Sequence, residues 1–181
     1  MQPERKVFVY IAISLDGYIA KENDDISFLS IVDKPGEDYG YSEFIKDVDT
    51  VIIGRKTYDK VLTFGIEFPH KDKRCYVITR TPREPADKLI FYTHSLRDLV
   101  LKLKQEEGKN IFVDGGSEII NTLLKQNLVD EFIISVIPVL LGGGIKLFRD
   151  GRPGMNLKLI GSKEFDTGLI QLHYRKISDQ Q

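Results

Sequence analysis

Three short segments of the sequence carry residue types that bind phosphate. They are residues 53–57 (IGRKT), 78–80 (ITR) and 113–117 (VDGGS), and each lies at the end of a β-branched apolar run. Glycine lets a ligand approach the backbone, a helix that starts just after it directs free N–H groups at an anion, and arginine or lysine adds charge-assisted hydrogen bonds. Three such segments suit a ligand with several separated phosphates, so a dinucleotide fits better than a single phosphate.

Other motifs for phosphate binding and nucleophilic catalysis do not fit the sequence. Lys56 and Thr57 follow an arginine rather than the glycine of a G-x-x-x-x-G-K-[ST] loop, and no G-x-G-x-x-G occurs. Residues 115–119 (GGSEI) lack the last glycine of a nucleophile elbow. Because any one glycine after a strand is often only a tight turn, the prediction rests on the combination of the three segments. The triplet at 142–144 (GGG) is either a flexible connection or a close approach to a cofactor.

Alternating strands and helices must position these segments. Apolar, β-branched runs predict strands, and apolar residues at a spacing of three and four predict helices. Ser95 is a good N-cap for the helix that follows, Gly108 suits the position after its end, and Asn127 can end the next helix in a left-handed conformation. The predicted strands are 6–13, 50–53, 73–79, 89–92 and 110–113, and the predicted helices are 41–48, 55–62, one from 96 and one from 117. A long loop joins the first strand to the first helix.

The last third of the sequence contains predicted strands only. Residues 130–141 form a β-rich run in which Pro138 marks an edge or a bulge, and the runs 155–165 and 169–177 should pair as an antiparallel hairpin. We therefore predict one α/β domain over residues 1–181, with three α/β/α layers and a mostly parallel sheet that has antiparallel C-terminal edge strands. The run 132–141 (FIISVIPVLL) is apolar enough that we expect a partner or a second copy to cover it.

The composition excludes several classes of partner. The chain has 181 residues and a formal net charge of -1, which excludes binding to nucleic acid through a general basic surface. Cys75 is the single cysteine, and the three histidines have no metal-ligand spacing, so we predict no metal site. The longest apolar run, around residues 133–141, is less than half of the about 20 residues that a membrane helix needs. We expect a cytoplasmic protein without a nucleic-acid or membrane partner.

Four segments of the sequence resemble a known family. They are residues 9–20 (VYIAISLDGYIA), 49–61 (DTVIIGRKTYDKV), 75–82 (CYVITRTP) and 111–144 (IFVDGGSEIINTLLKQNLVDEFIISVIPVLLGGG). Together they resemble the dihydrofolate reductase superfamily, and within it the C-terminal reductase domain of the bifunctional riboflavin-biosynthesis deaminase-reductase and its stand-alone relatives. The resemblance spans residues 6–177. It implies a dihydrofolate reductase-like fold and hydride transfer from NADPH to a small pyrimidine- or pterin-like substrate, as in 5-amino-6-(5-phosphoribosylamino)uracil reductase.

The resemblance also implies where NADPH binds. The pyrophosphate would lie at the start of the helix from Ser117, and the adenosine 2′-phosphate would lie near Arg80. The nicotinamide ring would be flanked by Ala12 and Ile19. Arg80 is the natural residue for preferring NADPH over NADH. The residues implied in cofactor binding are Ala12, Ile19, Gly54, Arg55, Lys56, Thr57, Thr79, Arg80, Gly115, Gly116 and Ser117.

A carboxylate is the expected catalytic group. Reduction of an imine or a carbonyl needs a hydride on carbon and a proton on the heteroatom, and a carboxylate can orient the substrate and relay that proton. We predict Asp38 in this role, with Glu43 and Asp16 as alternatives. The predicted substrate-binding residues are Ser14, Asp16 and Tyr41. Asp16 is also suited to closing the turn after the first strand, and Tyr41 to packing against the core.

Two departures from the family bear on the substrate. The sequence has no tryptophan, whereas dihydrofolate reductases carry one in the region after the first strand, and Asp114 stands where the riboflavin reductases usually have glutamate. Activity on folate or another pterin, and a non-catalytic NADPH-binding domain, therefore stay open as alternative functions. The resemblance further suggests a homodimer, formed through the β-rich C-terminal third.

Overall fold

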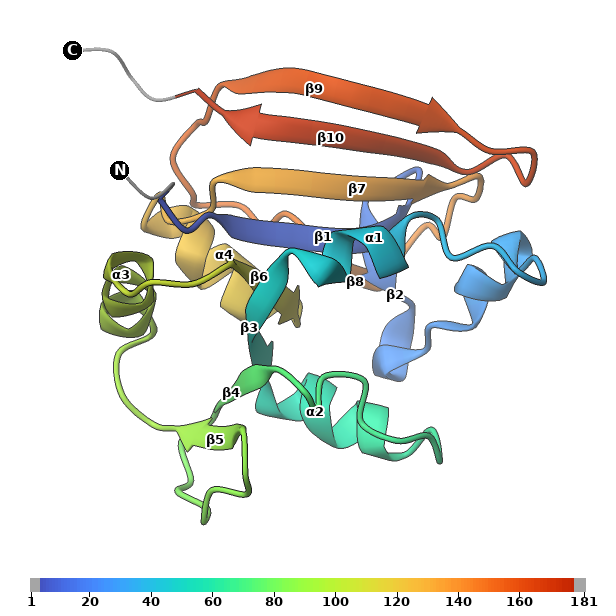
Figure 1. The fold of residues 1–181 in the computed structure, drawn as a ribbon. Coiled ribbons are helices and arrows are strands. Elements are labelled where there is room, and N and C mark those ends of the chain that lie inside the picture. The colour runs from blue at the N-terminus through green and yellow to red at the C-terminus, as the bar shows by residue number, and fades with distance from the viewer. Residues whose placement is uncertain (1–3, 178–181) are drawn as a thin grey trace.

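The strands form one eight-stranded sheet and one small two-stranded sheet (Figure 1). The computed structural model describes residues 4–177, and the order in the large sheet is β5-β4-β3-β6-β1-β7-β10-β9. Its strands are β1 (Val7–Ser14), β3 (Val48–Gly54), β4 (Arg74–Ile78), β5 (Leu89–Tyr92), β6 (Asn110–Gly115), β7 (Glu131–Ile137), β9 (Leu157–Glu164) and β10 (Ile170–Lys176). The small sheet pairs β2 (Tyr18–Ala20) with β8 (Ile145–Lys146).

Six neighbouring strands of the large sheet are parallel, and the last two are antiparallel. The strands from β5 to β7 pair in parallel, so their carboxyl ends meet at one edge. β10 runs antiparallel to β7, and β9 runs antiparallel to β10. This arrangement confirms the predicted mostly parallel sheet with antiparallel C-terminal edge strands. In open α/β sheets, ligands bind at the carboxyl ends of the parallel strands, so that edge is the expected ligand site.

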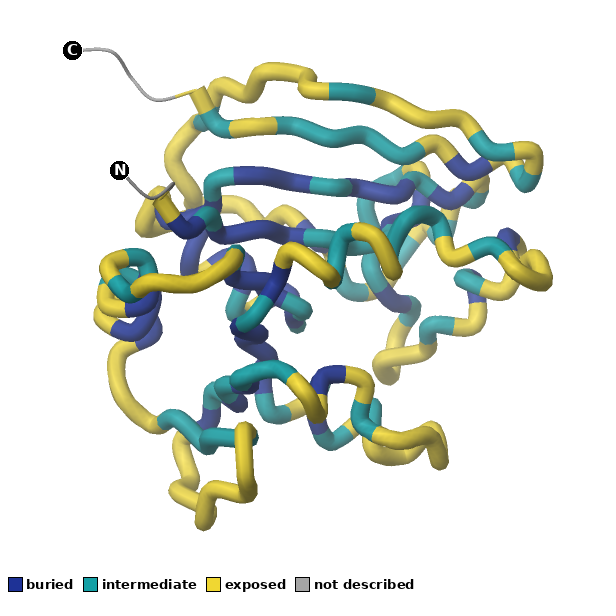
Figure 2. Tube along the Cα trace, in the orientation of Figure 1, coloured by how far each residue is buried: buried dark blue, intermediate teal, exposed yellow. Residues whose placement is uncertain are grey.

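Helices cover both faces of the sheet, which confirms the three predicted layers. They are α1 (Tyr41–Lys46), α2 (Arg55–Leu62), α3 (Leu96–Gln105) and α4 (Ser117–Lys125). Side chains alternate between the two faces along a strand. Ile111 and Val113 of β6 therefore pack with α3 and α4 in one core cluster, whereas Phe112 packs with Tyr58 of α2 and Phe44 of α1 in another. Figure 2 shows the central strands buried and β9 exposed along most of its length.

The local signals for helix ends are confirmed at two positions. Ser95 caps α3, since its Oγ accepts a hydrogen bond from the Asp98 backbone N–H at 3.2 Å. Asn127 follows α4 in a left-handed conformation with φ of 57°, and the Leu128 N–H donates to Leu123 O at 3.0 Å. This is the hydrogen-bond pattern by which a left-handed residue ends a helix.

Gly108 does not have the predicted role after α3. The helix ends at Gln105 and Glu106 is its C-cap, so Gly108 lies too far along the chain. Its φ of +153° and its surroundings explain why glycine stands there, because a Cβ atom would overlap Asp49 Oδ2 and lie 3.1 Å from Arg5 Cζ. The glycine therefore makes room for the buried Arg5 and its ion pair with Asp49.

Two further expectations about loops and edges are wrong. β7 ends at Ile137, before Pro138, and lies between β1 and β10. The chain itself therefore covers residues 132–137 on both sides, whereas Leu140, beyond the strand, is 68% exposed. The outermost strand is β9. The segment expected as a long loop contains β2 and two short 3-10 helices, η1 (Glu22–Asp24) and η2 (Ser27–Val32). The apolar pattern of the sequence did not predict these elements because they are short, with 3, 3 and 6 residues.

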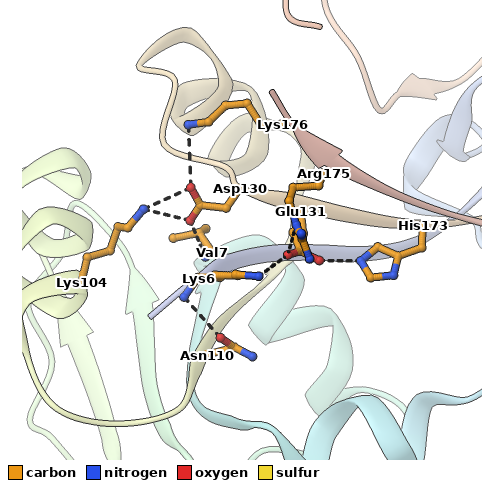
Figure 3. A network of polar contacts seen from close by, with 9 residues as sticks. All are labelled: Lys6, Val7, Lys104, Asn110, Asp130, Glu131, His173, Arg175 and Lys176. Carbon is orange, nitrogen blue, oxygen red and sulfur yellow. Dashed lines mark hydrogen bonds and ion pairs between the residues drawn. The ribbon is translucent and has the colours of Figure 1, made fainter. Parts of the chain in front are cut away.

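A buried glutamate joins three strands at the amino edge of the sheet (Figure 3). Glu131, at the start of β7, has a side chain that is 2% exposed. Its Oε1 accepts hydrogen bonds from Lys6 Nζ at 2.6 Å and from Arg175 Nε at 2.8 Å, and its Oε2 lies 2.6 Å from His173 Nε2. Burial alone would raise the pKa of Glu131, but these hydrogen bonds outweigh it and lower the pKa.

The neighbouring Asp130 extends this network to α3 and to the backbone of β1. Lys104 Nζ donates to Asp130 Oδ2 at 2.9 Å, and Lys176 Nζ lies 3.7 Å from Oδ1. The backbone N–H of Val7 donates to the same carboxylate at 2.8 Å. Figure 3 shows both carboxylates between the ends of β1, β7 and β10, so the network fastens the antiparallel strands to the parallel part of the sheet.

Candidate functional site

The three phosphate-suited segments lie together at the carboxyl edge of the large sheet. Gly54 at the end of β3 pairs with Ile78 of β4, and Ile53 pairs with Gly115 of β6. Neighbouring strands therefore end in the three segments, side by side. The prediction that these segments share one edge of the sheet is confirmed.

The first and third segments approach each other through their glycines. A Cβ atom added to Gly54 would lie 3.1 Å from Ile119 Cγ1 and 3.4 Å from Gly116 N, and one added to Gly116 would lie 3.0 Å from Thr57 Oγ1. The peptide bond between Gly115 and Gly116 is cis. Any side chain at Gly54 or Gly116 would crowd the space between the two segments. The glycines thus allow the starts of α2 and α4 to lie close together.

The start of α2 presents basic residues at this edge. Arg55 is half-buried, and its Nη1 donates to Asp59 Oδ2 at 2.6 Å, one turn along the helix. Lys56 is exposed, and Thr57 is half-buried. Because the first N–H groups of a helix have no partners within it, this end of α2 can receive an anion. The phosphate-binding roles of these three residues stay predictions.

The start of α4 carries a basic residue that sequence analysis missed. Ser117 is 4% exposed, and its Oγ accepts a hydrogen bond from Arg149 Nη2 at 2.7 Å. Asn121 donates to Ser117 O and to Leu147 O, each at 2.7 Å, and accepts from the Arg149 backbone N–H at 2.9 Å. These contacts tie the loop after β8 to α4 and bring a guanidinium to the helix N-terminus. No local spacing points to Arg149, because it lies 32 residues beyond Ser117.

In the second segment, residues 78–80, the Thr79 side chain forms a hydrogen bond and the Arg80 side chain is exposed. Thr79 is 8% exposed, and its Oγ1 accepts a hydrogen bond from the Thr81 backbone N–H at 3.1 Å, so this hydroxyl holds the turn after β4. Arg80 is exposed. Its position at the strand end is compatible with the predicted contact to a 2′-phosphate, which stays a prediction.

The two residues predicted to flank the nicotinamide lie in different apolar clusters. Ala12 is half-buried beside the cluster that contains Phe28 and Ile137. Ile19 is half-buried and packs against the larger core cluster, which contains α3 and α4. Packing alone therefore does not bring Ala12 and Ile19 together, and their role toward a cofactor stays a prediction.

Ser14 and Asp16 hold the turn after β1. Ser14 is 0% exposed; its Oγ donates to Asp16 Oδ1 at 2.6 Å and accepts from the Tyr18 N–H at 2.9 Å. The N–H groups of Leu141 and Gly142 donate to the two oxygens of Asp16 at 3.1 and 2.7 Å. Hydrogen bonds from Ser14 and from these N–H groups lower the pKa of Asp16 to about 2. The structure favours the turn-closing alternative for Asp16 and gives no support to a substrate contact by the buried Ser14.

Asp38 caps α1. Its Oδ1 accepts a hydrogen bond from the Gly40 N–H and its Oδ2 from the Ser42 N–H, each at 2.9 Å. Hydrogen bonds from Ser42 and Gly40 lower the pKa of Asp38. At neutral pH this carboxylate is therefore ionised, so it accepts hydrogen bonds but has no proton to donate to a substrate. The alternative, Glu43, is exposed and pairs with Lys46 at 2.7 Å. This geometry gives the predicted catalytic role of Asp38 no support.

Tyr41, the first residue of α1, lies near Asp114. Its ring packs edge-on against Tyr10 and Phe112, with centroid distances of 5.6 and 6.4 Å. Burial and the nearby Asp114 carboxylate raise the pKa of Tyr41. Its hydroxyl therefore keeps its proton at neutral pH and can donate a hydrogen bond.

Asp114 is a candidate that sequence analysis treated only as a departure from the family. It lies next to last in β6, directly before the paired glycines, and its Oδ2 is 2.9 Å from His70 Nε2. The side chain of Asp114 is 27% exposed and that of His70 is 3% exposed. Alternation along β6 places Asp114 on the same face as Phe112, which was the signal available in the sequence.

Two kinds of feature are not found within residues 4–177. No group of three or more histidine, cysteine, aspartate or glutamate side chains is placed to hold a metal ion. No helix in this part of the chain combines the length and the apolar character that crossing a membrane requires.

The sheet order and the two helical layers define a dihydrofolate reductase-like domain. A crystal structure of a Shewanella sp. PV-4 protein named for riboflavin biosynthesis superposes with a TM-score of 0.87 at 32% identity, covering 96% of this chain and 99% of that one. The deaminase and 5-amino-6-(5-phosphoribosylamino)uracil reductase of Thermotoga maritima superposes with a TM-score of 0.72 at 16% identity, covering 96% of this chain and 57% of that one. The latter likeness shows the fold alone.

Sequence comparison identifies the family within this class. The family model described as "RibD C-terminal domain" matches residues 5–171, and the chain belongs to that family. YwjB, an uncharacterized protein of Bacillus subtilis (strain 168), is 46% identical over 172 residues, which are 94% of this chain and 98% of YwjB. YyaP of the same organism is 32% identical over 185 residues, covering 94% of this chain and 95% of YyaP.

Proposed function

We propose that this protein is an NADPH-dependent reductase that transfers hydride to a small pyrimidine. The observation that carries the proposal is the convergence of three phosphate-suited strand ends at one edge of the sheet, in a chain of the RibD C-terminal domain family. A relative of this fold acts, by its name, on 5-amino-6-(5-phosphoribosylamino)uracil. That compound is therefore the substrate we propose first.

The residues at the strand ends fit NADPH. Gly54 and Gly116 let the starts of α2 and α4 lie close together, so the free N–H groups of two helix starts are near each other, as a pyrophosphate site requires. Arg55 and Arg149 lie at the starts of α2 and α4, and Arg80 is available for the 2′-phosphate. The donor set is thus basic and amide-rich, as a ligand with three phosphates requires.

The protein's own contribution to the reaction is to bind and orient the substrate. NADPH supplies the hydride when it is bound. Asp114 presents a partly exposed carboxylate that can accept N–H or O–H groups of a pyrimidine or its ribosyl substituent. Tyr41, which keeps its proton, can donate to a carbonyl of the same ring. These two side chains of opposite hydrogen-bonding character fix the orientation of a heteroaromatic substrate.

Cofactor binding and turnover test the proposal. NADPH and NADH are titrated separately into the purified protein and followed by fluorescence. Loss of the near-ultraviolet absorbance of NADPH is then followed with 5-amino-6-(5-phosphoribosylamino)uracil and, separately, with dihydrofolate. We expect tight NADPH binding, weaker NADH binding, and oxidation of NADPH by the pyrimidine.

The other outcomes distinguish the alternative functions. Oxidation of NADPH by dihydrofolate alone would support activity on a pterin. Tight NADPH binding with neither substrate oxidising the cofactor would support a non-catalytic NADPH-binding domain. Absence of NADPH binding at low salt would overturn the assignment altogether.

We further propose that the protein is a homodimer formed through its C-terminal strands. β9 is the outermost strand of the large sheet, so one of its sides has no neighbouring strand within residues 4–177. Leu157, Leu159 and Ile160 on it are 39%, 51% and 39% exposed. An exposed apolar edge strand pairs readily with another chain, and a second copy would cover it.

Light scattering at micromolar concentration tests the dimer. The wild type should have the mass of two chains, and Leu159→Lys should have the mass of one, because it places a charge in the apolar contact. Lys158→Ala, on the same strand, is the matched control and should remain dimeric. A monomeric wild type would contradict the proposal.

A further inference from the structure

A buried histidine holds one oxygen of the candidate substrate-binding carboxylate. His70 comes from the segment after α2, and its Nε2 lies 2.9 Å from Asp114 Oδ2. The two residues are 44 positions apart in the sequence, so the fold rather than the local chain brings them together. Within residues 4–177, His70 is the one side chain that hydrogen-bonds or ion-pairs with Asp114.

The two partners differ sharply in exposure. His70 is 3% exposed, whereas the side chain of Asp114 is 27% exposed. The carboxylate is therefore held from behind by a group that solvent does not reach, while part of it stays open. No lysine or arginine of the described chain neutralises Asp114 by an ion pair. Its charge and its second oxygen are thus available to a ligand.

The surroundings of His70 fix both the orientation of its ring and the position of its proton. The ring packs edge-on against Phe68 at 5.4 Å and against Phe112 at 5.8 Å. Its Nδ1 is buried and has no hydrogen-bond partner. A proton on Nδ1 would be a buried donor without an acceptor, and Nε2 would then turn a lone pair toward the carboxylate. The hydrogen-bond network therefore assigns the proton to Nε2, from which it is donated to Asp114.

We propose that His70 is a positioning residue, which holds Asp114 so that its free oxygen accepts a hydrogen bond from the substrate. This inference rests on the proposed function and adds a residue to the same site. The role requires an N–H donor at Nε2 and a ring that is held in place. The tautomer provides the donor, and packing against Phe68 and Phe112 holds the ring. His70 does not touch the substrate, and its effect is exerted through Asp114.

Two substitutions of His70 test whether its hydrogen-bond donor or only its volume matters. His70→Gln keeps an N–H donor near the position of Nε2, whereas His70→Leu fills the space without a donor. We expect His70→Leu to weaken binding of 5-amino-6-(5-phosphoribosylamino)uracil to the NADP⁺-saturated protein by about tenfold, as expected for the loss of a charge-assisted hydrogen bond. His70→Gln should stay within about threefold of the wild type, and both variants should bind NADPH as the wild type does.

The double variant and the histidine tautomer provide two further readouts. Once His70 is leucine, Asp114→Asn should weaken pyrimidine binding by much less than it does in the wild type, because the two residues act as a unit. Nitrogen-15 NMR of the histidine rings at neutral pH should show His70 with its proton on Nε2. This measurement needs neither substrate nor turnover.

The outcomes separate this inference from the proposed function. If the wild type binds NADPH and the pyrimidine, and His70→Leu binds the pyrimidine as tightly as the wild type, the positioning role is overturned alone. A proton found on Nδ1 overturns it as well, as does equal weakening by His70→Gln and His70→Leu. If the wild type binds neither NADPH nor the pyrimidine, the proposed function fails, and the positioning role fails with it.

Discussion

Replacing Arg80 with alanine should weaken NADPH binding by about 10- to 100-fold, which corresponds to the loss of one or two charge-assisted hydrogen bonds. NADH lacks the 2′-phosphate, so its affinity should change by less than about threefold. The exposed guanidinium at the end of β4 is the physical reason, since it can contact a phosphate without first breaking a buried contact. Titration of both cofactors at one fixed ionic strength measures the difference.

Arg74→Ala is the matched control for this prediction. Arg74 lies at the other end of the same strand and pairs with Glu106 at 2.9 Å, so its removal should leave both cofactor affinities unchanged. Equal losses of NADPH and NADH affinity in Arg80→Ala would show that Arg80 contributes general charge rather than recognition of the 2′-phosphate. No loss for either cofactor would place the 2′-phosphate elsewhere.

Replacing Glu131 with glutamine should lower the free energy of unfolding by about 2–4 kcal/mol. The substitution keeps the shape of the side chain but leaves Lys6, His173 and Arg175 facing an amide instead of a carboxylate. The lower part of the range allows for solvent screening, because the three partners are partly exposed. Urea unfolding followed by circular dichroism measures the loss, and Glu164→Gln, on the exposed face of β9, should change stability by less than about 0.5 kcal/mol.

The same carboxylate should make stability depend on acid pH. The pKa of Glu131 is lower in the folded protein than its ordinary value of 4.5, so the unfolded chain binds more protons in that range. The stabilisation is therefore fully present above about pH 4.5 and is lost as the pH falls through the folded pKa. In Glu131→Gln this contribution is absent, so the decline of stability below that pH should be shallower. Parallel curves for wild type and variant would contradict the assignment.

The features that sequence analysis predicted correctly depend on local patterns. The bounds of α2 and the cap at Ser95 follow from residue types within one or two turns of chain. The parallel sheet follows from the alternation of strands and helices. Because parallel strands end at the same edge, it places the three segments there for any conformation of the loops. The fold class and the shared edge of the three segments could thus be predicted from the sequence.

The features that were missed depend on contacts between distant parts of the chain. Arg149 reaches Ser117, His70 reaches Asp114, and the N–H groups after β7 occupy Asp16. Whether a carboxylate faces a substrate or holds a turn depends on which backbone N–H groups the fold brings near it. That information is absent from residue spacing, so the hydrogen-bond partners of Asp16 and Asp38 could not be predicted from the sequence.

The position of β1 in the sheet bears on how the chain reaches its native state during synthesis. β1 is first in the sequence, yet its neighbours are β6 and β7, so Val7 pairs with Ile111 and Phe8 with Glu131. A nascent chain on the ribosome must keep this apolar segment unpaired until well over half of the polypeptide has emerged. Fragments that stop before β7 should therefore leave β1 exposed and prone to aggregation, and the parallel sheet should be complete only when synthesis is nearly finished.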